Sequence, residues 1–111
     1  MEKINKKKLI LIELNEINFD IVKKYIDSSS LKYFPLLVNQ NTKTTLAEKE
    51  YSKLEPWIQW VSVHTGMDAD QHKIFRLGDS SNFNYEQIFE KIEKKNFSVG
   101  VLFAMNVINK N

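Results

Sequence analysis

Two short apolar runs near opposite ends of the chain limit its fold more than any other feature of the sequence. Residues 9–14 are almost continuously apolar and rich in β-branched side chains, and residues 97–105 have a similar character. Runs of this kind are typical of strands buried on both faces of a sheet. Because no hairpin turn signal lies between them, we expect parallel pairing through right-handed crossovers, with residues 9–14 and 98–103 as adjacent or near-adjacent core strands.

Amphipathic helical patterns occupy much of the sequence between these runs. The spacing of apolar residues predicts helices over residues 18–27, 57–65 and 84–95. Pro56 suits the first position of the second helix, and Gly66 suits its C-terminal cap. The predicted fold class is therefore α/β: a partial parallel sheet with crossover helices.

Three weaker patterns complete the predicted organisation of the chain. They indicate a packed connection or helical turn over residues 31–38, a short strand over residues 43–46 and a polar loop over residues 68–72. No internal repeat or low-complexity linker divides the sequence. We therefore interpret residues 1–111 as a single incomplete α/β domain.

Composition excludes several classes of function. The 111 residues carry 16 Lys+Arg and 14 Asp+Glu, a formal charge of +2, which is too balanced for a nucleic-acid or acidic-membrane footprint. The absence of cysteine excludes disulfide scaffolds, thiol nucleophiles and cysteine-ligated zinc. No apolar stretch approaches the roughly 20 residues that span a bilayer, and no secretion signal is recognised. We expect a cytoplasmic chain with neither nucleic-acid nor membrane partners.

The most specific motif covers residues 55–66, EPWIQWVSVHTG, followed by His72-Lys-Ile-Phe and Leu77-Gly-Asp. This region resembles the nucleophile-helix region of the alkaline-phosphatase-like superfamily, which includes sulfatases, phosphodiesterases and nucleotide pyrophosphatases. The residues at corresponding spacings are Trp57, Trp60, Ser62, Thr65, Gly66, His72 and Ile74. The likeness covers nearly the whole chain, but only as the first part of a fold that is several times longer in the family.

The resemblance implies an N-terminal portion of a metal-dependent phosphoesterase- or sulfatase-like hydrolase. It would use a divalent metal (zinc, manganese or magnesium), with Glu13, Asn15 and Glu16 competing to supply the first metal-binding side chain. Trp57 and His72 are the implied substrate-binding residues. These roles are what the resemblance implies for this sequence.

The family's threonine nucleophile falls on Pro56, which has no nucleophilic atom. The adjacent Glu55 is then the candidate catalytic residue, either as a metal ligand or as a carboxylate at the phosphate position. Most metal ligands would come from the missing C-terminal part, so we expect the isolated chain to be inactive.

Other interpretations of the same residues remain open. Trp57, Trp60, Val61 and His64 share one helical face, as core residues do, and we expect His64 to be half-buried and hydrogen-bonded. Glu55 beside a helix start has a simple helix-dipole explanation. The alternative function is a small non-enzymatic α/β binding or interaction module, whose apolar faces are covered by a partner or by self-association.

Overall fold

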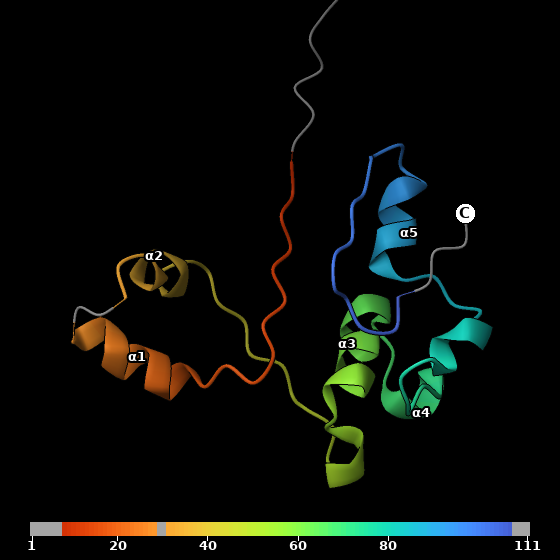
Figure 1. Cartoon of the computed structure of the whole chain (residues 1–111), viewed down its shortest axis with the longest axis horizontal. Coiled ribbons are helices and arrows are strands. Elements are labelled where there is room, and N and C mark those ends of the chain that lie inside the picture. Colours follow the sequence, from red (N-terminus) through yellow and green to blue (C-terminus); the bar gives the residue numbers. More distant parts are fainter. Residues whose placement is uncertain (1–7, 29–30, 108–111) are drawn as a thin grey trace, which may run out of the picture. The chain divides into compact units, whose positions relative to one another are not determined.

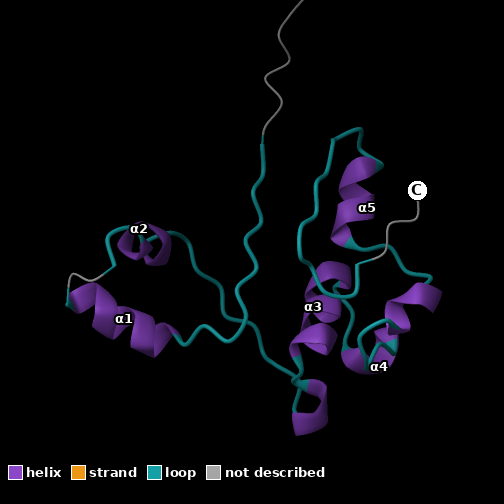
Figure 2. Ribbon diagram, viewed as in Figure 1, coloured by secondary structure: helices purple, strands orange, loops and turns teal. Residues whose placement is uncertain are grey.

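The computed structural model describes residues 8–28 and 31–107, and within these residues it contains helices but no strand. The chain separates into two compact units, Met1–Thr42 and Lys43–Asn111. Figure 1 labels the α-helices along the chain, and Figure 2 shows the loops that join them. Over the described part of the chain, no helix is both long and apolar enough to cross a lipid bilayer.

The predicted α/β fold with a parallel sheet is wrong. Residues 9–14, 43–46 and 98–103, which we expected to form strands, contain none. A helix satisfies its hydrogen bonds within one segment, whereas a strand requires a second segment beside it. Apolar, β-branched composition therefore indicates the tendency to form a strand but does not supply the neighbouring strand.

The first unit contains two short helices, α1 (Phe19–Asp27) and α2 (Phe34–Val38). The Asn18 side chain caps α1 by accepting hydrogen bonds from the backbone N–H groups of Asp20 and Ile21, at 2.9 and 3.1 Å. This confirms the helix predicted over residues 18–27, and α2 confirms a helical turn within residues 31–38. None of the residues described in this unit is buried.

The second unit is built around α3 (Pro56–Thr65), which packs against α4 (Ala69–His72) and α5 (Ile88–Glu93). Two 3₁₀ turns complete it: η1 (Tyr51–Lys53) and η2 (Asp79–Asn82). Among the residues described in this unit, the buried apolar side chains are Ile58 and Val61 of α3, Ala69 of α4, Ile74 after α4 and Phe83 after η2, and of these Val61, Ile74 and Phe83 form a connected cluster. The three residues of this cluster therefore come from different parts of the unit.

The ends of the helices in this unit follow recognisable sequence signals. As predicted, Pro56 begins α3, and Gly66 ends it in the left-handed conformation at φ 75°. The polar loop predicted over residues 68–72 is instead the helix α4, because Asp68 and Gln71 form a reciprocal capping box. The helix predicted over residues 84–95 is shorter, because Gln87 forms the capping box with Glu90 and α5 begins after it.

The two units should differ sharply in hydrogen exchange. Helices α1 and α2 have 9 and 5 residues and bury no side chain, and helices shorter than about 12 residues are marginal without tertiary packing. We expect amides of α1 to exchange at rates close to those of an unfolded peptide, and amides in the last turn of α3 to be protected. Equal protection of α1 and α3, measured by mass spectrometry or NMR, would contradict this difference.

Candidate functional site

The start of α3 carries the residues that the family resemblance places at the catalytic centre. Glu55 is the N-cap residue, it is exposed, and its side chain makes no capping hydrogen bond. Its backbone carbonyl accepts from the N–H groups of Ile58 and Gln59, at 2.9 and 3.0 Å. Pro56 supplies a helical φ but no hydroxyl, so the only reactive group at this helix start is the Glu55 carboxylate.

Trp57 is fixed in the first turn of α3 by a hydrogen bond to the loop after α4. Its indole Nε1–H donates to the carbonyl oxygen of Phe75 at 3.1 Å. The Asp79 carboxylate holds the same loop from its other side, because Oδ2 accepts from the N–H groups of Phe75 and Arg76, at 3.1 and 2.9 Å. Trp57 is half-buried, and the hydrogen bond to Phe75 anchors the polar edge of its indole ring.

Ser62 on α3 and His72 at the end of α4 form a side-chain pair. Ser62 Oγ lies 3.0 Å from His72 Nε2, and the His72 ring is almost fully buried, at 3% exposure. The other ring nitrogen, Nδ1, accepts a hydrogen bond from the backbone N–H of Ile74 at 3.0 Å. Nδ1 must therefore be unprotonated, and in the neutral ring the proton resides on Nε2.

This tautomer decides what the pair does chemically. Nε2–H donates to Ser62 Oγ and has no lone pair with which to accept the serine proton. A serine activated by a histidine base requires the opposite arrangement. Burial lowers the pKa of His72, against the opposing effect of the Asp68 and Glu48 carboxylates, which favours the neutral ring. The pair is arranged to position α4 on α3 and not to activate a nucleophile.

His64 lies on the same helix but in an aromatic environment. It is buried at 2% exposure, and not half-buried as predicted, between Trp60 at a ring-centroid distance of 6.0 Å and Phe89 of α5 at 4.8 Å. The rings stack on one side and meet edge to face on the other. His64 therefore joins α3 to α5.

Asn106 is the centre of a polar network in the second unit. Its amide Nδ2 donates to the carbonyl oxygens of Trp57 and Arg76, at 2.8 and 3.2 Å. Its Oδ1 accepts from the N–H of Gly78 at 3.0 Å, with the Ser80 hydroxyl at 3.5 Å. Figure 1 shows the chain after α5 turning back toward α3.

The backbone of Asn106 takes part in the same network. Its carbonyl oxygen accepts from Gln87 Nε2 at 2.7 Å, beside the start of α5. Asn106 adopts a left-handed backbone, φ 52°, which asparagine tolerates better than most residues. One buried residue thus connects α3, the loop after α4, η2 and the start of α5.

A second polar cluster holds the chain before α3 to α4. The buried Lys53 ammonium donates to Asp70 Oδ2 at 2.7 Å and to Glu50 Oε1 at 2.9 Å. The hydrogen bond to Asp70, followed by that to Glu50, raises the pKa of Lys53, which stays charged. Glu48 Oε1 accepts from the N–H of Ala69 at 2.9 Å, at the start of α4. These acidic residues are engaged in orienting a short helix.

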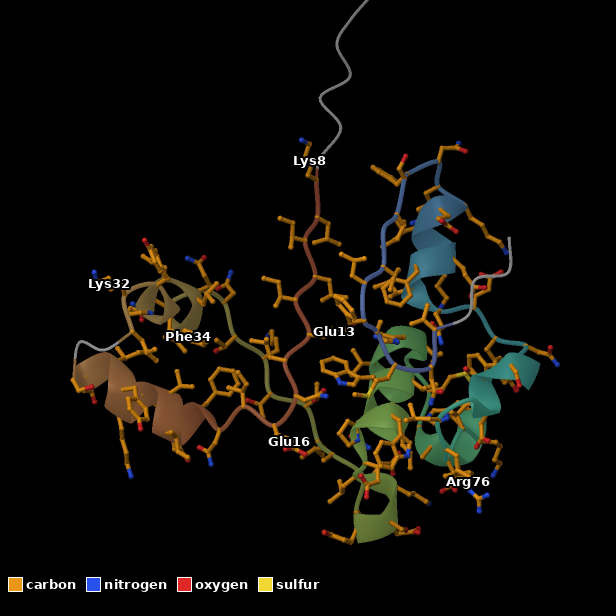
Figure 3. All side chains as sticks on the ribbon, viewed as in Figure 1. Lys8, Glu13, Glu16, Lys32, Phe34 and Arg76 are labelled. Atoms are coloured by element: carbon orange, nitrogen blue, oxygen red, sulfur yellow. The ribbon has the colours of Figure 1, made fainter. Side chains whose placement is uncertain are left out.

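The predicted metal ligands Glu13, Asn15 and Glu16 belong to the first unit. Figure 3 labels Glu13 and Glu16. Glu13 is half-buried, while Asn15 and Glu16 are exposed on a turn in which Glu16 has φ 55°. Carboxylate and amide oxygens are donors that suit magnesium or manganese. Within residues 8–28 and 31–107, however, His, Asp and Glu side chains do not gather in threes around a point that could hold a metal ion. The donor chemistry fits a hard cation, but the arrangement does not form a coordination shell.

Known proteins offer no further guide to the site, since no family model, curated protein or solved structure matches the chain. The likeness to the alkaline-phosphatase-like superfamily therefore stays a prediction. So do the catalytic role of Glu55 and the substrate-binding roles of Trp57 and His72.

Sequence reasoning missed the residues that hold the second unit together. The Asp68–Gln71 capping box was available as a local signal, because the two residues have the required spacing. Asn106 gave only a weak signal: a polar residue that ends an apolar run and tolerates a left-handed backbone. Nothing local indicated that Ser62 and His72 would meet or that Lys53 would be buried.

Replacing Asn106 should destabilise the second unit. Asn106→Ala removes the hydrogen bonds to the Gly78 N–H and to the Trp57 and Arg76 carbonyls, and each intramolecular hydrogen bond contributes about 0.5–1.5 kcal/mol to stability. We expect the free energy of unfolding to fall by about 2–4 kcal/mol on this basis. The sequence has two tryptophans, both in α3, so fluorescence in denaturant measures this unit directly.

Two control variants separate the hydrogen bonds from the backbone conformation. Asn106→Gly removes the same side chain but tolerates the left-handed φ, so it should recover only a small part of the loss. Asn96→Ala changes an exposed asparagine with φ 61° and should cost only the backbone term. Equal effects of Asn96→Ala and Asn106→Ala would show that the network does not stabilise the unit.

Proposed function

We propose that the chain is the N-terminal portion of a metal-dependent phosphoesterase- or sulfatase-like hydrolase, and that it does not catalyse hydrolysis by itself. The observation that most supports this proposal is that residues 55–66 contact the segment that follows them in the motif. Its separate parts fold together, with Trp57 bonded to Phe75 and Ser62 bonded to His72. These contacts fix the start of α3 relative to the residues that follow it, as a helix start that faces a reaction centre would require.

The same geometry supports the inactivity of the chain alone. Pro56 stands at the position of the family's nucleophile and has no reactive atom. The Ser62 hydroxyl faces a nitrogen that donates to it, so it is not activated by His72. A divalent metal would supply Lewis-acid chemistry in a complete site.

An assay with added metal tests this proposal. The 111-residue chain is incubated with zinc, manganese or magnesium and an aryl phosphate, a phosphodiester or an aryl sulfate. We expect rates indistinguishable from those without protein, for the wild type, for Glu55→Ala and for Glu93→Ala, which changes an exposed acid on α5. Robust turnover that is lost in Glu55→Ala but kept in Glu93→Ala would contradict the assigned inactivity.

A second candidate function, a non-enzymatic interaction module, is favoured by the apolar surface of the chain. Ile10 is 82% exposed and Ile12 is 68% exposed, within a run of apolar neighbours. Leu102 and Phe103 are 84% and 101% exposed. Contiguous apolar surface of this kind marks contact with other protein. The contact is with the remainder of a hydrolase under the first proposal and with a partner or second copy under this one.

Association should follow from this exposed surface. We expect light scattering of the purified chain to detect oligomers or aggregates, because exposed apolar segments pair with one another. Ile10→Lys combined with Ile12→Lys should reduce association, whereas Gln40→Lys adds a positive charge at an exposed polar position and should not. A wild-type chain that stays sharply monomeric would count against the first proposal.

A further inference from the structure

We propose that His72 is a proton-sensitive latch in the second unit, which releases the turn over residues 72–75 when the imidazole becomes a cation. The proposal rests on the hydrogen bonds around the ring. Nδ1 accepts from the Ile74 N–H at 3.0 Å, and Nε2–H donates to Ser62 Oγ at 3.0 Å. One nitrogen is thus committed as acceptor and the other as donor, a pattern that only the neutral ring satisfies.

Protonation removes the acceptor. A proton on Nδ1 points at the N–H of Ile74. Two donors then face each other across the 3.0 Å that separated donor from acceptor, and they repel. The ring is 3% exposed, so water does not readily accept the displaced hydrogen bond. Either the imidazolium turns out of its site or the Ile74 amide moves away, and both changes break the closed turn.

The position of Ile74 gives this local event a wider consequence. Ile74 is 4% exposed and packs with Val61 and Phe83 in the core. Movement of its amide therefore disturbs the packing between α3 and the chain after η2. The next residue, Phe75, is held separately by Trp57 and Asp79, so the break is confined to the start of the turn.

Burial of the His72 ring lowers its pKa by more than the acidic side chains around the ring raise it. On the elements packed about His72, the charged or titratable side chains are Glu48, Lys53, His64, Asp68, Asp70 and Lys73. Asp68 and Glu48 favour the cation, and burial disfavours it more strongly, so the pKa of His72 is lowered. Lys53 and Asp70 bond to each other, and α3 carries no Asp, Glu, Lys or Arg over residues 56–65.

The direction of the pH dependence follows from this lowered pKa. Between the folded-state pKa and the ordinary histidine pKa of about 6.5, the unfolded chain binds more protons than the folded one. The contribution to stability is therefore complete above the unfolded-state pKa and is lost as the pH falls toward the folded-state pKa. One proton taken up on unfolding raises the unfolding equilibrium constant by up to about tenfold per pH unit.

The test compares the wild-type chain with His72→Asn in denaturant titrations followed by tryptophan fluorescence, from about pH 7.5 to about pH 5, which brackets the ordinary histidine pKa. Asparagine places an uncharged acceptor near the position of Nδ1, so it retains the bond to Ile74 but does not titrate. We expect the unfolding constant of the wild type to rise steeply on acidification and that of His72→Asn to rise much less. Equal slopes would overturn the proposal.

Two further measurements keep the result decisive. His64→Phe removes the other histidine and serves as the control for the choice of ring; loss of the slope in this variant but not in His72→Asn would overturn the assignment to His72. If either variant fails to fold, ¹⁵N NMR of the wild-type His72 ring gives the answer. At neutral pH we expect the proton on Nε2, and a proton on Nδ1 would overturn the latch.

Discussion

The second unit depends on the hydrogen bonds of one buried residue, Asn106. Asn106 bonds to Trp57, Arg76 and Gly78 through its side chain and to Gln87 through its carbonyl oxygen. The apolar core of the second unit is small: among its described residues, the buried apolar side chains are Ile58, Val61, Ala69, Ile74 and Phe83. With so few buried apolar groups, paired polar groups must orient the short helices, because each backbone group that they satisfy would otherwise be costly to bury.

The same principle explains why the motif residues are engaged in structure. His72 uses both ring nitrogens to join α3, α4 and the following turn, and Lys53 joins the chain before α3 to Asp70. Both ring nitrogens of His72 are held by hydrogen bonds inside the fold. Protonation of the ring would break one of these bonds, and this makes the stability of the unit sensitive to pH. Reactivity toward a substrate would need Glu55, which is the exposed acid at the helix start.

Local signals in the sequence predicted α1 and α3 closely and α5 in part, whereas α4 was predicted as a loop and the predicted sheet does not form in the described residues. Asn18, Pro56 and Gly66 mark helix ends by their own chemistry, so α1 and α3 could be predicted within a residue or two. Residues 9–14 and 98–103 have strand composition, but pairing depends on segments distant in the sequence, and the described chain forms no ladder. The Asn106 network and the Ser62–His72 pair were unpredictable for the same reason, since both join residues that only the tertiary fold brings together.

The most direct test of this account is a pair of truncated chains, one ending after Val107 and one ending after Met105. The longer chain keeps the Asn106 side chain and its carbonyl, whereas the shorter chain loses both. Denaturant unfolding followed by tryptophan fluorescence should remain cooperative for the chain ending at Val107 and become broad, with low initial stability, for the chain ending at Met105. Cooperative unfolding of both chains at the same midpoint would contradict the claim that Asn106 holds the second unit together.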